Sequence, residues 1–180
     1  TLNAVYTPTP AELAAGTLTL TLTTTGNNNC NAVASTRTIT FTPAPVVDAG
    51  ANGTVCSNAS LITLNGSVSG ATGAIWSGGA GVFTPNNATL NTTYQPTTAE
   101  RNAGTVTLTL TSAGNGNCNA VSDQVTFSIT PAPTANAGVD QSLCSNNAVA
   151  TMNGSFTVAT GGIWSGGAGT FSPSATLMNA

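Results

Sequence analysis

The sequence contains very little charge. Only 4% of its 180 residues are charged, the formal net charge is −3, both basic residues are arginines (Arg37 and Arg101), and lysine and histidine are absent. A chain without a basic patch cannot neutralise phosphates, which excludes nucleic-acid binding. A chain without histidine lacks a common metal ligand and general base, and five scattered carboxylates offer little for acid–base chemistry or calcium. We therefore expect no enzyme, no metal site and no cofactor.

Long hydrophobic runs are also missing. No stretch of about 18 apolar residues is present, so the sequence predicts no membrane span. Apolar residues make up 40% of the chain, which suits a folded core rather than a disordered segment. No signal peptide is recognisable at Thr1, and we interpret the chain as an internal piece of a longer protein.

What the sequence does contain is an internal repeat with a period of 88 residues. The segment PAPVVDAGANGTVCSN returns as PAPTANAGVDQSLCSN, and IWSGGAGVFTP returns as IWSGGAGTFSP. Equivalent residues include the pairs Tyr6 and Tyr94, Cys30 and Cys118, Pro43 and Pro131, Cys56 and Cys144, and Trp76 and Trp164. Proline-containing TPAP segments have the character of junctions, because proline lacks a donor and stiffens a linker. The repeat predicts that residues 1–42 are the C-terminal half of one domain, 43–130 a complete domain, and 131–180 the N-terminal half of a third.

Strict alternation of apolar residues with threonine predicts β-strands. Residues 105–111 and their equivalents 17–23 place valine or leucine on one face and threonine on the other, and Val125, Phe127 and Ile129 alternate in the next strand. Shorter strands are expected around Ile62, Trp76, Val82 and Tyr94, with one helical turn capped by Thr98 and ended by Gly104. In the first copy Arg37 falls at an inward position, and we expect it at a strand end.

About seven short strands in 88 residues favour an all-β fold, namely tandem immunoglobulin-like β-sandwich repeats. Aromatic residues make up only 5% of the chain, so a few of them must fill much of each core. The predicted core aromatics are Trp76, Trp164, Tyr6, Tyr94, Phe83 and Phe127.

The pattern AGVDQSLC … NGS … IWSGGAG … AGTVTLTL … GNCNAVSDQVT resembles tandem Ig-like or PKD-like repeats of very large Bacteroidota surface proteins. These include gliding-motility adhesins secreted by the type IX system. PKD domains carry a WDFGDG-like strand where this chain has IWSGGAG, so the Ig-like type is the better match. The resemblance implies secretion and an extended surface stalk, and it supplies no catalytic residues.

Four cysteines without Cys-x-x-Cys spacing suggest disulfides in an oxidising setting. A Cys56–Cys118 bridge is the obvious pairing, but it fits poorly because the two residues are expected at opposite ends of one domain. Two alternatives stay open beside it. Cys30 could pair with Cys56 and Cys118 with Cys144 if the junctions fold back, or one domain's lower end could bond to the next domain's upper loop.

Six Asn-x-Ser/Thr sequons are candidate glycosylation sites, and they also suit turns. They are Asn52, Asn58, Asn65, Asn87, Asn91 and Asn153.

The sequence predicts a rigid structural segment of a long extracellular bacterial surface stalk or filament. Its expected partners are neighbouring repeats and, by strand addition or lateral packing, identical chains. The alternative is an adhesin module that binds glycans or other surfaces through its repeated loops.

Overall fold

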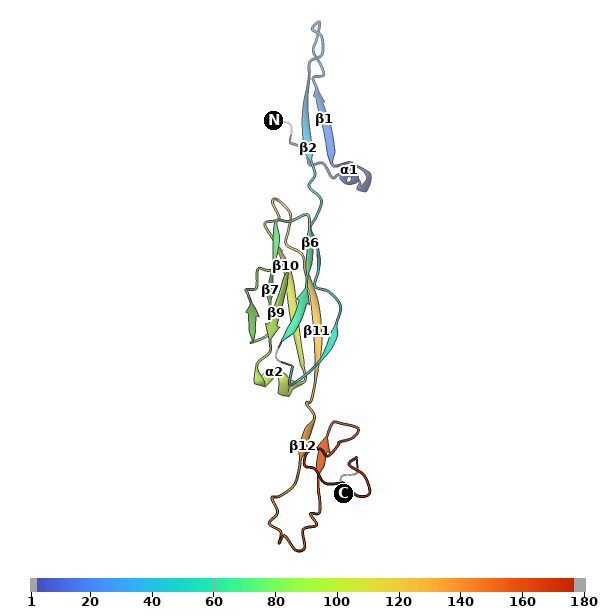
Figure 1. Ribbon diagram of the computed structural model, residues 1–180. Coiled ribbons are helices and arrows are strands. Elements are labelled where there is room, and N and C mark those ends of the chain that lie inside the picture. Colours follow the sequence, from blue (N-terminus) through green and yellow to red (C-terminus); the bar gives the residue numbers. More distant parts are fainter. Residues whose placement is uncertain (1–2, 60, 177–180) are drawn as a thin grey trace.

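The structure is a computed structural model that describes residues 3–59 and 61–176. Three units follow one another along a line (Figure 1). A hairpin with a short helix comes first, a β-sandwich lies in the middle, and a more open unit follows. The chain enters the sandwich at one end and leaves it at the other.

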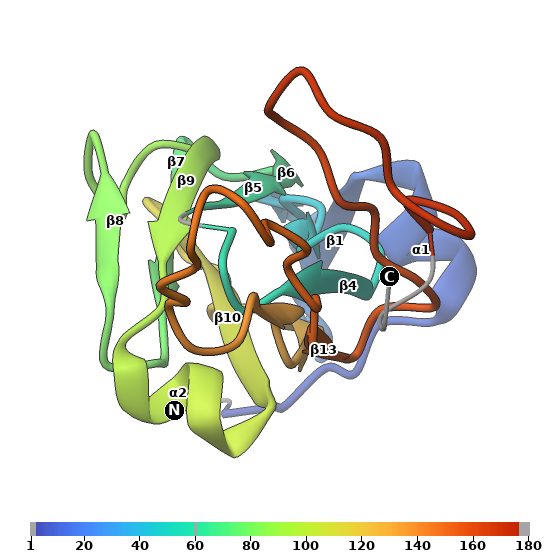
Figure 2. The ribbon, with the colours of Figure 1, turned by 60° about the horizontal axis from the view of Figure 1, so that its bottom comes forward.

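The sandwich is built from two main sheets. One has the strand order β4-β11-β10-β7 and the other has the order β5-β9-β8. A further pair, β3 with β6, runs along the edge, and β3 packs against β10 and β11. The strand bounds are β3 (Val46–Asp48), β4 (Gly53–Cys56), β5 (Ile62–Asn65), β6 (Ser67–Ser69), β7 (Gly73–Ser77), β8 (Val82–Thr84), β9 (Asn91–Gln95), β10 (Thr105–Ala113) and β11 (Ser122–Thr130). Turned by 60° from Figure 1, the view in Figure 2 separates the layer of β8, β9 and β5 from the layer of β10 and β4.

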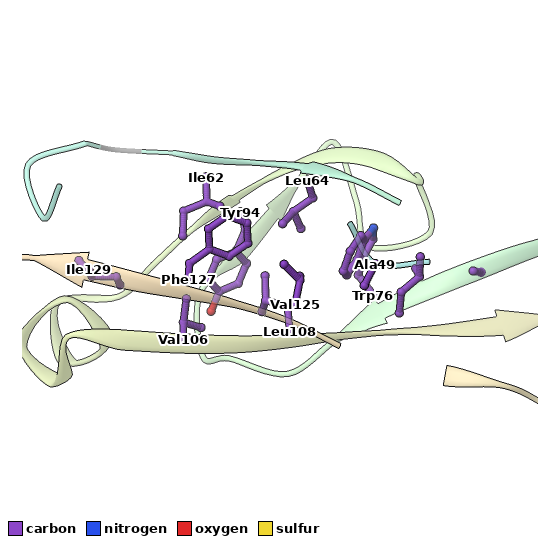
Figure 3. Close-up of a cluster of buried hydrophobic side chains, with 12 residues drawn as sticks. Ala49, Ile62, Leu64, Trp76, Tyr94, Val106, Leu108, Val125, Phe127 and Ile129 are labelled. Atoms are coloured by element: carbon purple, nitrogen blue, oxygen red, sulfur yellow. The ribbon is translucent and has the colours of Figure 1, made fainter. Parts of the chain in front are cut away.

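The alternating pattern produces this core directly. Along β10 the apolar residues are buried, whereas their threonine neighbours are exposed or half-buried. Figure 3 shows Ile62 and Leu64 of one sheet facing Leu108, Val125 and Phe127 of the other. All the buried hydrophobic residues of the described chain lie between Ala49 and Ile129. Two antiparallel sheets that bury such a face between them, with one parallel pair (β4 with β11), form the predicted all-β, immunoglobulin-like sandwich, which is confirmed.

The first unit repeats part of this sandwich. Helix α1 (Pro10–Ala15) and strands β1 (Thr17–Thr23) and β2 (Ala34–Thr40) correspond to α2 (Thr98–Ala103), β10 and β11. Thr17 pairs with Thr40, as Thr105 pairs with Ser128, so the register is the same 88 residues later.

The third unit repeats the other part. Strands β12 (Thr134–Asn136) and β13 (Ser155–Thr157) correspond to β3 and β6 and pair in the same register. No residue among 3–44 and 131–176 is fully buried, in contrast to the central sandwich.

Two local predictions were wrong. The helical turn is capped by Thr97 rather than Thr98, because Glu100 stands three residues after Thr97 and completes a capping box with it. Arg37 lies in the middle of β2 opposite Leu20, not at a strand end. It is exposed there because no second sheet covers that face of the hairpin.

Candidate functional site: the loops and ends of the sandwich

The SGGAG loop between β7 and β8 is held by two side chains. Tyr94 Oη accepts a hydrogen bond from Gly81 N–H at 2.7 Å and donates one to Glu100 Oε1 at 2.7 Å. The same carboxylate oxygen accepts from Ala80 N–H at 2.8 Å. A Cβ added at Gly79 would lie 2.0 Å from Tyr94 Oη, so this position has no room for a side chain. Contacts with Tyr94 and Glu100 therefore explain why this loop is built of small residues.

The hydrogen bonds of this network shift the pKa values of Tyr94 and Glu100. Burial, together with the hydrogen bond to Glu100, raises the pKa of Tyr94 to about 12. Burial opposes ionisation of Glu100, but the hydrogen bonds from Ala80, Thr97 and Tyr94 outweigh it and lower the pKa of that carboxyl. Both groups keep their ordinary charge states at neutral pH and serve as structural partners.

The other carboxylate contacts in the sandwich are structural too. Asp123 accepts from Ala49 N–H at 2.8 Å, which holds the segment between β3 and β4 to β11 and lowers the pKa of this aspartate. Asp48 accepts from Gly50 N–H two residues later in a turn. Among the residues that the structure describes, no cluster of three metal-ligating side chains occurs. No helix in that part of the chain is long and apolar enough to cross a membrane.

The predicted core aromatics divide according to position. Trp76 and Tyr94 are fully buried, and Phe127 is 9% exposed. Phe83 is half-buried with its ring centroid 4.9 Å from that of Tyr94. Tyr6 is 45% exposed and Trp164 is half-buried, because within residues 3–59 and 61–176 the strands that cover Tyr94 and Trp76 have no counterpart beside them.

The four cysteines are free thiols in this structure. Cys118, in the loop between β10 and β11, lies at the upper end of the sandwich with Sγ 3.6 Å from the carbonyl oxygens of Thr42 and Pro43. Cys56 ends β4 at the opposite end, with Sγ 3.9 Å from the carbonyl oxygen of Pro131. Strands of nine residues, about 30 Å long, separate the two ends.

The outer two cysteines lie farther away still. Cys30 belongs to the β1–β2 loop, which points away from the sandwich, and Cys144 belongs to the loop segment after β12 at the other extreme of the molecule (Figure 1). The junctions run straight on rather than folding back (Figure 1). The pairings of Cys30 with Cys56 and of Cys118 with Cys144 require junctions that fold back.

All six sequon asparagines are exposed. Asn87 is the most engaged of them, because its Nδ2 donates to the carbonyl oxygen of Trp76 at 3.0 Å. The Asn52 side-chain oxygen accepts from Thr126 N–H at 2.7 Å, which leaves its nitrogen uninvolved in that contact. Glycosylation of these residues stays a prediction.

The third unit has an apolar groove of about 480 Å³. Its lining includes Ala135, Phe156, Ile163 and Trp164. The equivalent positions of the central repeat are Val47 in β3, Val68 in β6, and Ile75 and Trp76 in β7. There β7 pairs with β10, and β3 packs against β10 and β11. Sequence reasoning did not anticipate this groove, although the position of the half-repeat boundary was a signal for it.

Comparisons with known proteins find similar solved structures but no similar family or curated protein. No protein-family model matches the chain, and no curated protein matches it significantly. Similar solved structures include a protocadherin gammaB7 EC3-6 cis-dimer structure (14% identity, TM-score 0.36, covering 72% of this chain and 38% of that one). Protocadherin gamma B2 extracellular cadherin domains 3-6 match with 15% identity and a TM-score of 0.35, covering 72% of this chain and 37% of that one. Domains 1-5 of the same protein match with 13% identity and a TM-score of 0.37, covering 79% of this chain and 32% of that one. The chain spans about a third of the length of these structures.

Proposed function

We propose that this chain is part of a tandem array of immunoglobulin-like sandwiches that acts as a rigid spacer in a long extracellular bacterial surface protein. In this proposal residues 43–130 are one complete domain. Residues 1–42 are the second half of the preceding domain, and residues 131–180 are the first half of the next. The Bacteroidota surface stalks that the sequence resembles are the class of protein in which we place it.

One observation carries the proposal: the chain enters and leaves the sandwich at opposite ends (Figure 1). The lower junction is fixed to the sandwich. Ser57 N–H donates to the Thr130 carbonyl at 2.8 Å, and Ala132 N–H donates to Ser57 Oγ at 2.8 Å. Prolines at 131 and 133 restrict the backbone next to these bonds. Such junctions favour a straight array over a flexible chain of beads.

The surface supports the same role. The outer face of β10 and β11 carries paired hydroxyl groups, with Thr107 and Thr126 Oγ1 atoms 2.9 Å apart and Thr111 Oγ1 2.9 Å from Ser122 Oγ. These groups satisfy one another across the strands, and the face has almost no charge to repel a neighbour. Lateral packing or strand addition between identical chains is therefore part of the proposal.

The adhesin alternative receives less support. Its argument was the near identity of the loops in successive copies, but the SGGAG loop is explained by its contacts with Tyr94 and Glu100. The loops also lack exposed aromatic residues suited to sugars. A glycan array probed with this chain tests the alternative, and saturable binding to one class of glycan would favour it.

The spacer role is tested by length. Arrays of two, four and eight copies of residues 43–130 are measured by small-angle X-ray scattering. A rigid array increases its maximum dimension in proportion to copy number, by about 35–40 Å per repeat from strand length and turns. Dimensions that grow only as about the square root of copy number, as for a flexible linker, would contradict the proposal.

A further inference from the structure

The two cysteines of the central repeat contact equivalent atoms at opposite ends of the sandwich. Cys118 Sγ lies 3.6 Å from the carbonyl oxygen of Pro43, at the junction with the preceding unit. Cys56 Sγ lies 3.9 Å from the carbonyl oxygen of Pro131, at the junction with the following unit. Pro43 and Pro131 are the same residue of the repeat, 88 positions apart.

In a continuous array both contacts therefore fall on one junction. The domain before the junction contributes its Cys56-type thiol, and the domain after it contributes its Cys118-type thiol. Since both sulfurs lie within 4 Å of one carbonyl oxygen, they can be no farther apart than the two distances placed end to end. This limit holds whatever the relative rotation of the two domains.

The cysteine loops keep their conformation in the incomplete units, which supports the transfer from one repeat to another. Cys118 N–H donates to Asn115 O at 3.0 Å, and Cys30 N–H donates to Asn27 O at the same distance. Ala59 N–H donates to Cys56 O at 2.8 Å, and its equivalent Asn147 donates to Cys144 O at 2.9 Å. The thiols are thus presented on the same turns in each copy.

We propose that a disulfide crosses each junction, between the Cys56-type cysteine of one domain and the Cys118-type cysteine of the next. A disulfide forms between them where their Cα atoms lie within about 7 Å of one another and their side chains rotate to bring the sulfurs together. Formation removes one proton and one electron from each thiol. A disulfide-bearing oxidant accepts them: one thiolate attacks its disulfide to form a mixed disulfide, the second thiolate displaces it, and the oxidant leaves as two thiols.

This assignment accounts for four free thiols in one chain. The partner of Cys56 belongs to the second half of the following domain, and the partner of Cys118 belongs to the first half of the preceding domain. Neither half lies within these 180 residues. The bridge would join consecutive sandwiches covalently beside the proline junction and would limit their bending.

The inference rests on the proposed tandem organisation, and its test completes one more domain. Residues 1–4 are equivalent to residues 177–180, so appending residues 5–42 after Ala180 continues the repeat without a gap. The lengthened chain is folded, equilibrated with oxidised and reduced glutathione, blocked with an alkylating reagent and mapped by mass spectrometry without reduction. Burial of Trp164, seen in its fluorescence, reports separately whether the third sandwich has formed.

We expect one linkage, between Cys56 and the appended copy of Cys30. Cys118, Cys144 and the original Cys30 should remain thiols, because their partners are absent. Cys56→Ser should abolish the linkage, whereas the matched Cys118→Ser should leave it unchanged. A free Cys56 thiol beside a folded third sandwich would overturn the disulfide while leaving the spacer proposal intact. A linkage from Cys56 to Cys118 or Cys144 would overturn it too.

A second chain keeps the proposal falsifiable if the appended segment does not fold. Two copies of residues 43–130 in direct succession contain every strand of both sandwiches and one junction. Cys56 of the first copy should pair with Cys118 of the second, leaving one thiol in each copy. Recovery of four thiols under the same glutathione conditions would contradict the bridge.

Discussion

The flanking units repeat parts of the central sandwich, with about half of the aligned residues identical, but their burial is very different. Leu110 in β10 is completely buried, whereas its equivalent Leu22 in β1 is 61% exposed. Tyr94 is completely buried, whereas Tyr6 is 45% exposed. The local structure is nevertheless the same, since Tyr6 donates to Glu12 at 2.6 Å as Tyr94 does to Glu100. Local hydrogen bonding is thus encoded within a half-repeat, but a core requires both halves.

The tryptophan pair should give the largest contrast. Trp76 is completely buried, and its Nε1 donates to the Leu90 carbonyl at 3.1 Å. We expect Trp76→Ala to lower the free energy of unfolding of the sandwich by about 3–5 kcal/mol, through the lost contacts and the cavity left behind. The matched Trp164→Ala should leave the sandwich transition unchanged. Urea titration followed by circular dichroism measures both, and equal losses would contradict the comparison.

The leucine pair should separate the two environments by a smaller amount. Leu110→Ala removes a buried side chain that packs near Gly66 and Trp76, and it should cost about 2–5 kcal/mol. Leu22→Ala removes an exposed side chain, so the sandwich midpoint in urea should stay within the error of the measurement. A large shift from Leu22→Ala would mean that the hairpin has a buried face after all.

The tyrosine pair tests the hydrogen-bond network rather than the core. Tyr94→Phe leaves Gly81 N–H without its acceptor and removes a donor from Glu100, and we expect a loss of about 1–3 kcal/mol. Tyr6→Phe should not move the transition of the sandwich. Amide hydrogen exchange at Gly81 provides a local readout, because only the first variant should accelerate it.

Alkaline pH should weaken the sandwich through the same tyrosine. The pKa of Tyr94 is raised to about 12 in the folded protein from an ordinary value of 10, so the folded state favours the protonated phenol. Its contribution is fully present below about pH 10 and is lost as the pH rises towards 12. Stability measured across this range should fall in the parent chain, and the Tyr94→Phe variant should lack this part of the decline. An identical profile in both would contradict the assignment.

Much of the fold follows from the sequence because the alternation of apolar residues with threonine or serine identifies β1, β10 and β11. The strands that were missed, β3, β4, β6, β12 and β13, are three or four residues long and carry no clear alternation. β4 is a strand because it pairs in parallel with β11, a tertiary contact that no local pattern encodes. Arg37 was misplaced for a related reason, since its exposure depends on the absence of a covering sheet.

The candidate site was predictable only in part. Sequence spacing placed Cys56 and Cys118 at opposite ends of the domain, in agreement with their contacts at Pro131 and Pro43. The sequence could not show that Cys56 and Cys118 contact equivalent carbonyl oxygens, those of Pro131 and Pro43. These contacts exist only in the folded protein, and their equivalence follows from the 88-residue period. The links from Tyr94 and Glu100 to the SGGAG loop were likewise invisible, since the two segments meet only in the folded sandwich.

The central claim is that each flanking unit gains a core when its missing half is supplied. Hydrogen–deuterium exchange at residues 162–165, which surround Trp164, tests it most directly in the parent chain and in the chain lengthened by residues 5–42. Trp164 N–H already donates to the Ala175 carbonyl oxygen at 2.8 Å in the parent. The account therefore predicts that exchange at 162–165 slows in the lengthened chain, to the protection of the equivalent residues 74–77. Equal and fast exchange at 162–165 in both chains, with 74–77 still protected, would contradict it.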